Sequence, residues 1–454
     1  MGKLIYEKPI ISKIVITNNK YGMVPRIQTI SEIDGLKIKD LLKQYGSPLY
    51  VVSEQTLVDT LNRFKTAFET RYPKVVFAWS YKTNYLDAVC RIFHRHGWWA
   101  EVVSGFEYEK ALQNGVDGKN IIFNGPYKPE ADLRRAVENE SLIHIDHFDE
   151  LYTLIRMADS LPKRPRVAIR VNMDTGIYPQ WDRFGFNYDN GEAWQALTKI
   201  MISGKLELVG LHTHIGTYIM SPNPYAVAVS KLLRLAYDLE QKFGHKIKYI
   251  DLGGGFASKN TLKGAYLPGK DTCPSFDEYA ENITNAILNS EYADLNNLPT
   301  LVLETGRALI DDAGYILGTV VANKRLANGR RALIIDIGLN NLFTSFWYNH
   351  DILPVDPPSE FTEDTTIYGP LCMNIDVIHP AIQFPPMNPG DHVAVIRTGA
   401  YNMTQWLQFI MYRPNVVLID TQGKTHIIRK KEDIETFNRQ EVVPEYLKEW
   451  KKQE

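Results

Sequence analysis

The stretch KVVFAWSYKTNYLDAVCRIFHRHGWWAEVVS (74–104) predicts a strand, a helix and a second strand. Its two apolar runs, 74–81 and 99–104, are rich in β-branched and aromatic residues, and a helix-capable segment, 84–97, lies between them. Neither run alternates apolar with polar residues, which is typical of parallel strands that are buried on both faces. The stretch therefore predicts one β-α-β unit of a parallel sheet.

The same alternation continues along the chain. Further β-rich runs are NIIFNG (120–125), SLIHID (141–146), RVAIRV (166–171), LELVGLHTHI (206–215), KYIDLGG (248–254) and TLVLETG (300–306). Between them lie helix-capable segments such as 224–244, which has apolar residues at helical spacing and stops at Gly244. Eight units in about 235 residues match a (β/α)8 TIM barrel. A doubly wound open sheet is the competing fold, but the count of eight and the lack of GxGxxG after the first strand favour the barrel.

After about residue 310 the pattern changes to a two-residue period. The runs 314–325, 331–338, 392–397 and 415–423 alternate, with Gly, Asn and Asp between them, which predicts a C-terminal antiparallel β-domain. An early run, PIISKIVI (9–16), also has β character. We expect residues 1–47 to join the β-domain, residues 48–312 to form the barrel, and residues 313–454 to form the β-domain.

The composition excludes several classes of protein. The 454 residues carry 51 basic and 53 acidic side chains, a net charge of -2, which argues against a nucleic-acid-binding domain. No apolar run is long enough for a membrane helix, and we find no secretory signal. The three cysteines, Cys90, Cys273 and Cys372, are far apart, which disfavours disulfides or a zinc cluster and fits a reducing cytoplasm.

The active site of such barrels lies at the carboxyl ends of the strands. At three of these ends the sequence has residues suited to one cofactor. Lys82 follows the first strand as a candidate Schiff-base nucleophile whose pKa desolvation would lower, although a lone lysine there is more often a surface residue. Gly253, Gly254 and Gly255 follow the seventh strand, where backbone N–H groups can approach a phosphate. Glu304 ends the eighth strand and needs a cationic partner, which a pyridinium nitrogen or Arg307 would provide. Pyridoxal 5'-phosphate requires this set of groups.

The sixth strand ends in two histidines, His212 and His214. They share one face of the strand and could suggest a metal. No Glu or third His lies at ligand spacing in the sequence, so we expect no metal here. We expect a ring-stacking or hydrogen-bonding role for a histidine.

The ordered motifs resemble the fold-type III pyridoxal-phosphate decarboxylases, which include diaminopimelate, ornithine and arginine decarboxylases, and most of all the diaminopimelate branch. The similarity covers roughly residues 45 to 425. Its motifs are SYKTN (80–84), EVVSGFE (101–107), RFGF (183–186), GLHTHIGT (210–217), DLGGGF (251–256), ETGR (304–307), DIGLNNL (336–342), GPLCMNID (369–376) and GAY (399–401).

The resemblance implies roles for individual residues. Lys82 would hold pyridoxal 5'-phosphate as an internal aldimine until the substrate amine displaces it into an external aldimine, from which the α-carboxylate leaves. His214 would stack on the ring and Glu304 would pair with the ring nitrogen. The phosphate would be bound by Thr217, Gly253 to Gly255, Gly306, Arg307 and Tyr401. Cys372 would donate a proton from the partner subunit, so the resemblance implies a homodimer with shared active sites.

Three positions depart from the resembled branch. Met373 replaces the Glu that grips a distal ammonium, Thr344 aligns with the Arg that grips a distal carboxylate, and Thr305 replaces a Pro. Without both charged partners, recognition of free diaminopimelate would lose several kcal/mol, about 2–5 by analogy with other truncated charge pairs. The pocket would instead contain Met373, Phe343, Phe346, Trp347 and Tyr348, with Tyr178 and Trp181 nearby.

We therefore expect a decarboxylase for an amino acid with a neutral, aromatic, acylated or carrier-tethered distal end, of the kind used in siderophore or natural-product pathways. A genuine diaminopimelate decarboxylase of lysine biosynthesis is the alternative. An amino-acid racemase shares the barrel and the lysine, but the GPxC…D signature favours a decarboxylase. A non-catalytic regulator would be expected to lose Lys82 or Cys372, and both are present.

Overall fold

In the computed structural model, which describes residues 27–294, 297–356 and 361–448, eight parallel strands close into a barrel. Parallel pairings of β13 with β4 and of β10 with β8 complete the ring. The strands are β4 (Val75–Ser80), β5 (Trp99–Val102), β6 (Ile121–Phe123), β7 (Leu142–Ile145), β8 (Arg166–Asn172), β10 (Glu207–His212), β11 (Tyr249–Asp251) and β13 (Thr300–Thr305). All eight fall on the predicted runs, so the (β/α)8 prediction is confirmed and the open sheet is excluded.

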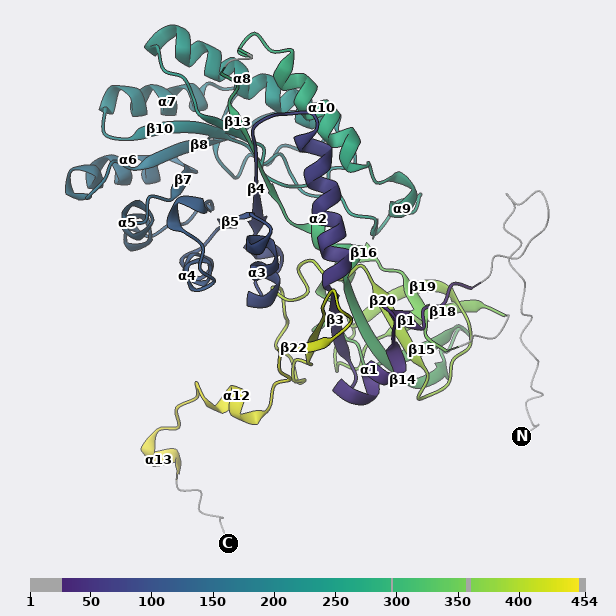
Figure 1. Cartoon of the computed structure of the whole chain (residues 1–454). Helices are drawn as coiled ribbons and strands as arrows, with labels where there is room; N and C mark the ends of the chain where they lie inside the picture. The colour runs from purple at the N-terminus through teal and green to yellow at the C-terminus, as the bar shows by residue number, and fades with distance from the viewer. Residues whose placement is uncertain (1–26, 295–296, 357–360, 449–454) are drawn as a thin grey trace, which may run out of the picture.

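Helices cover the outside of the barrel (Figure 1). They are α2 (Glu54–Glu69), α3 (Asp87–Arg95), α4 (Gly105–Gln113), α5 (Glu130–Glu138), α6 (Phe148–Met157), α7 (Glu192–Ser203), α8 (Asn223–Phe243) and α10 (Phe276–Leu288). The predicted stop of α8 is confirmed, since Gly244 caps it at φ 62° and its N–H bonds back to Glu240. Among the described residues, no helix is long and apolar enough to cross a membrane.

The second domain is a mixed sheet in which most neighbours are antiparallel. Its strands include β14 (Gly314–Arg325), β15 (Arg331–Ile335), β17 (Ile352–Pro354), β18 (Glu363–Tyr368), β19 (Val377–Phe384), β20 (His392–Ile396), β21 (Val416–Ile419) and β22 (Thr425–Arg429). The pairings of β15 with β18 and of β21 with β3 are parallel. The predicted β-domain is therefore present, with two parallel pairings that a two-residue period does not reveal.

One strand before the barrel belongs to this second sheet. β3 (Leu49–Ser53) lies between β14 and β21, and not in the barrel, although the expected barrel began at residue 48. Its fully buried run of five residues looks like a barrel strand, and only its partners tell them apart. The first helix of the described chain, α1 (Ile38–Tyr45), packs through Ile38 and Leu41 on the same sheet. The early run 9–16 lies outside the described residues.

A turn of the β-domain contacts the turn that carries Lys82. The Tyr401 N–H donates to the Thr83 carbonyl (2.8 Å), and the Thr404 hydroxyl donates to the Lys82 carbonyl (2.8 Å). The Asn84 side chain donates to the Gly399 carbonyl (3.2 Å). Both domains therefore fix the backbone at the mouth of the barrel.

Candidate active site

Lys82 lies directly after β4 and forms an ion pair with Glu101 of β5. Its Nζ is 2.7 Å from Glu101 Oε2, which also accepts a hydrogen bond from Ser80 Oγ (2.5 Å). Burial alone would lower the pKa of Lys82, but the charges of Glu101, Tyr401 and Glu304 outweigh it and the pKa is raised. The expected lowering of this pKa by desolvation is therefore wrong, because the sequence did not show the carboxylates around the amine.

Asn124, at the end of β6, joins that ion pair to Glu304 of β13. Its Nδ2 donates to Glu101 Oε1 (3.0 Å) and to Glu304 Oε1 (2.7 Å). A side-chain amide has two N–H donors, so both are used. A continuous chain of polar contacts therefore runs from Lys82 to Glu304 across the floor of the mouth. The alternative pairing of Glu304 with Arg307 does not occur, since Asn124 and His212 take that place.

Two stacked histidines lie beside Glu304. His212 Nε2 is 3.4 Å and His144 Nδ1 is 3.9 Å from its carboxylate oxygens, and the two rings are 4.5 Å apart. Burial lowers the pKa of both histidines well below the ordinary value, with nearby positive charge adding to it. Potential ligand atoms of His144, His212 and Glu304 lie within 4.8 Å of one another. The spacing in the sequence did not show this group, because folding brings residues of three strands together. The expectation that no metal binds here stays a prediction.

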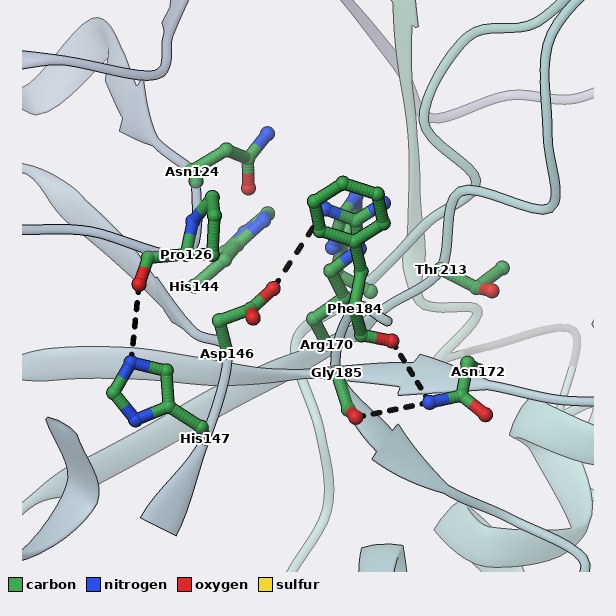
Figure 2. Close-up of polar contacts among 12 residues, drawn as sticks. Asn124, Pro126, His144, Asp146, His147, Arg170, Asn172, Phe184, Gly185 and Thr213 are labelled. Atoms are coloured by element: carbon green, nitrogen blue, oxygen red, sulfur yellow. Dashed lines mark hydrogen bonds and ion pairs between the residues drawn. The ribbon is translucent and has the colours of Figure 1, made fainter. Parts of the chain in front are cut away.

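Arg170 of β8 closes another side of the mouth. Its guanidinium is 3.7 Å from Asp146 and lies 4.5 Å from the ring of Phe184. Figure 2 shows Phe184 across Arg170, with Asn172 donating to the carbonyls of Phe184 and Gly185. These contacts hold the segment between β8 and β9 (Phe186–Asn187) against the barrel.

His214 lies beside the glycine run after β11. A Cβ on Gly253 would come within 2.8 Å of His214 Cβ, and one on Gly255 within 2.4 Å of the Gly216 carbonyl and 3.3 Å of His214 Cε1. Gly253 and Gly255 also have φ of 64° and 92°, which favour glycine. The run therefore has to be glycine for this loop to approach His214. Thr217, three residues after His214, is exposed.

Arg307 begins the short helix α11 (Arg307–Ile310) and lies in a cage of aromatic rings. Its guanidinium is 4.6 Å from the ring centroid of Tyr401, 5.2 Å from Tyr348 and 5.7 Å from Tyr218. The side chain is buried, and Nη1 has no hydrogen-bond partner within the described ranges. Gly306, just before it, would place a Cβ 2.0 Å from the Thr83 hydroxyl. The site thus holds a buried cation with a free donor, which is what an incoming phosphate needs.

The predicted substrate residues lie on the β-domain and divide into two groups. Phe346 and Trp347 are 39% and 36% exposed, and Trp347 lies edge-on to Tyr401 at 6.2 Å. Thr344 is 1% exposed, and its hydroxyl contacts Asn402 Oδ1 (3.0 Å) and His350 Nε2 (2.8 Å). Tyr348 is also buried, against Arg307. Thr344 therefore faces the interior of its domain and not the mouth.

Cys372 is exposed on the turn between β18 and β19, and the neighbouring Met373 is half-buried. The Asp376 carboxylate fixes this turn by accepting from the backbone N–H groups of Leu339 and Leu371, both at 2.7 Å. No contact between Cys372 and the Lys82 side of the same chain occurs in the structure as described. Cys90 is buried in the barrel core.

Three residues of the site were not predicted from the sequence: Glu101, Asn124 and Arg170. Glu101 lies in the motif EVVSGFE, and a carboxylate inside the apolar run WAEVV has to be paired. Asn124 and Arg170 also end predicted strands, so the rule that placed Lys82 would have found them.

The residues present fit pyridoxal 5'-phosphate. A lysine amine, a buried carboxylate opposite it, a glycine loop and a buried arginine with an unpaired N–H match the aldehyde, the ring nitrogen and the phosphate. When bound, this cofactor withdraws the electron pair that a departing carboxylate leaves behind. Fold and site together define an enzyme that depends on pyridoxal phosphate.

Comparison with known proteins narrows this class. The family described as "Pyridoxal-dependent decarboxylase, pyridoxal binding domain" matches residues 55–311. The diaminopimelate decarboxylase of Methanothermobacter thermautotrophicus is 30% identical over 430 residues, covering 91% of this chain and 96% of that protein. That of Aquifex aeolicus is 29% identical over 410 residues, covering 88% and 93%. A solved diaminopimelate decarboxylase from M. jannaschii matches with a TM-score of 0.84 and 27% identity, covering 93% and 98%.

This chain belongs to the pyridoxal-dependent decarboxylase family. It is a carboxy-lyase that uses pyridoxal 5'-phosphate, and it resembles the diaminopimelate decarboxylases. The resemblance found in the sequence and the cofactor expected from it are confirmed. The individual roles of the site residues stay predictions.

Proposed function

We propose that the enzyme removes the α-carboxylate from an amino acid whose distal end is neutral, acylated or carrier-tethered, and not from free diaminopimelate. The supporting observation is the inward-facing Thr344, whose hydroxyl is already bonded to Asn402 and His350. The neighbouring exposed side chains, Phe346 and Trp347, are aromatic. A distal charge placed there would lose water without gaining an ion partner, at a cost of about 2–5 kcal/mol.

Decarboxylation of diaminopimelate itself is the second candidate, favoured by the names of the relatives. Carbon dioxide release from meso-diaminopimelate and from a panel of Nε-acylated and carrier-linked amino acids separates the two. We expect kcat/KM on the best neutral or acylated substrate to exceed that on diaminopimelate by about a hundredfold. Diaminopimelate turnover that equals the best of the panel would overturn the proposal.

The chain's own residues then have these roles. Lys82 supplies the amine for the cofactor aldehyde, and Glu101 holds that amine in place. Glu304, fixed by Asn124, would provide the anionic partner of the ring nitrogen, and Arg307 with the Gly253–Gly255 loop would hold the phosphate. Cys372 donates the proton that replaces the lost carboxylate at the α carbon.

We also propose a homodimer in which Cys372 acts in the partner's site. The support is its exposed position on a turn that Asp376 makes rigid. Mixing Lys82→Ala with Cys372→Ala subunits tests this. Half of the re-formed dimers would be mixed, and each mixed dimer would have one site in which both Lys82 and the partner's Cys372 are intact. About a quarter of wild-type activity would therefore return. Activity no greater than the sum of the two variants would contradict sharing.

The three free cysteines support a cytoplasmic location.

A further inference from the structure

The ring of His214 is bounded by parts of the protein on two sides. On one side lies the glycine loop, where a Cβ on Gly253 or Gly255 would come within 3.0 or 3.3 Å of a ring atom of His214. On another lies Trp181, whose ring centroid is 5.6 Å from that of His214 at an interplanar angle of 59°. The His214 Nδ1 is buried without a hydrogen-bond partner in the described part of the chain. Packing, and not hydrogen bonding, therefore fixes this ring.

Trp181 is itself held firmly, although it comes from the irregular segment between β8 and β9. Its carbonyl accepts from the Phe184 N–H (3.2 Å), and the preceding Gln180 donates to Asn172 Oδ1 (2.6 Å). Tyr178 accepts at its hydroxyl from the Met220 N–H (2.8 Å), which ties the segment to the loop after His214. The segment is therefore anchored before, after and beside Trp181.

The indole also lies close to the backbone that carries His214. A Cβ built on Gly216 would be 3.8 Å from Trp181 Nε1, so the indole covers the loop immediately after His214. Phe184, three residues further on, covers Arg170 at 4.5 Å (Figure 2). One segment thus places two aromatic side chains against two residues of the mouth.

We propose that Trp181 is a positioning residue that supports the His214 ring in the orientation required to stack on the cofactor. This inference rests on the proposed stacking role of His214 and is independent of the identity of the substrate. Within the described residues, Trp181 provides the aromatic contact of a ring whose Nδ1 has no hydrogen-bond partner, so removing the indole is expected to free the imidazole to rotate.

A double-mutant cycle on the apoenzyme tests the proposal. The affinity for pyridoxal 5'-phosphate is measured for the wild type, Trp181→Ala, His214→Ala and the double variant, by titration followed by absorbance. We expect His214→Ala to weaken binding about tenfold and Trp181→Ala about fivefold. Because Trp181 acts through His214, the double variant binds no more weakly than His214→Ala alone.

Two further variants separate positioning from folding. Trp181→Phe keeps an aromatic ring and should restore most of the affinity, whereas Trp194→Phe, which changes a tryptophan packed on Phe243 of α8, should leave it unchanged. Melting temperatures of all apoenzymes show whether a variant is folded. On cofactor uptake, Trp181→Phe should lose more of the fluorescence quenching than Trp194→Phe.

The outcomes are distinguishable. If His214→Ala does not weaken binding, the stacking role of His214 fails and the inference fails with it. If His214→Ala weakens binding but Trp181→Ala does not, or if the two losses add in the double variant, Trp181 does not act through His214 and only the inference is overturned.

Discussion

The two sides of the barrel mouth are built in opposite ways. On the barrel side, charged groups have polar partners: Lys82 pairs with Glu101, and the Asn124 amide joins Glu101 to Glu304. On the β-domain side, Phe346 and Trp347 are exposed, and the polar Thr344 is turned inward. The barrel side therefore carries the groups for reaction chemistry, whereas the β-domain side offers an apolar surface to the distal end of the substrate. Changes on the two sides should have different consequences.

The largest effect is expected on the barrel side, for Lys82→Ala. Without the amine, decarboxylation should fall by at least about a thousandfold, and the yellow absorbance of the cofactor-bound lysine should vanish. Lys74→Ala is a matched control, because Lys74 precedes the same strand at its opposite end and its amine donates to the Leu298 carbonyl, away from the mouth. A Lys82→Ala protein that keeps its colour and activity would remove the lysine from the site.

Arg307→Leu tests the other end of the cofactor and should have the next largest effect. It removes a buried cation with an unpaired N–H, so affinity for pyridoxal 5'-phosphate should drop about a hundredfold in titrations of the apoenzyme. Arg307→Lys keeps the charge but loses the planar stacking on Tyr401, and we expect about a tenfold loss. Arg166→Leu, at the opposite end of the barrel, should leave the affinity unchanged.

Much of this contrast was accessible from the sequence. The eight strands were predicted correctly because buried parallel strands are continuous apolar runs, and the residues that follow them have to share one end of the barrel. That rule placed Lys82, Glu304 and Arg307 at one mouth, where the structure has them. It could not show that Glu101 and Asn124 connect them, because those contacts depend on where the side chains lie, and the contact of Asn124 with Glu304 joins residues 180 positions apart.

The β-domain side was less predictable. The alignment of Thr344 with the Arg of the resembled branch stays a prediction. Its partner Asn402 is 58 residues away, so only the fold shows that its hydroxyl is turned inward. Likewise β3 resembles a barrel strand in composition, and its partners β14 and β21 decide its sheet. The orientation of Thr344 and the sheet of β3 both depend on contacts between residues far apart in the sequence, which periodicity does not show.

A smaller effect is expected for Glu107→Gln in α4, on the barrel side, which should change how the free energy of unfolding depends on pH. Burial raises the pKa of this carboxyl to about 7, the Val103 N–H opposes the rise, and the nearby Glu101 charge adds to it. The ordinary pKa of a glutamate, about 4.5, applies to the unfolded chain, so folding favours the protonated form of Glu107. The contribution of this carboxyl to the free energy of unfolding is therefore fully present below about pH 4.5 and is lost as the pH rises through about 7. Glu107→Gln should be more stable than wild type at pH 8 by at most about 3 kcal/mol, with the difference shrinking toward pH 5.

Urea unfolding of wild type and Glu107→Gln at several pH values between 5 and 8 measures this difference. Glu109→Gln is the matched control, since Glu109 lies on the same helix but is exposed. It should follow the wild-type pH profile. A Glu107→Gln profile parallel to the wild type would show that Glu107 does not titrate in this range.

The smallest effect is expected for Thr344→Val, and it sharpens the contrast most directly. If Thr344 serves only its own domain, the loss of its bonds to Asn402 and His350 should lower the free energy of unfolding by about 1 kcal/mol. Cofactor affinity, and KM for the best substrate, should stay within about threefold of wild type, because the side chain does not face the mouth.

Trp347→Ala should have the opposite effect and raise KM about tenfold without loss of cofactor affinity, since Trp347 is exposed beside Tyr401. A large rise in KM for Thr344→Val at unchanged stability would place this residue in contact with the substrate. The β-domain side would then recognise its ligand by a hydrogen bond, and the difference between the two sides of the mouth would be one of degree.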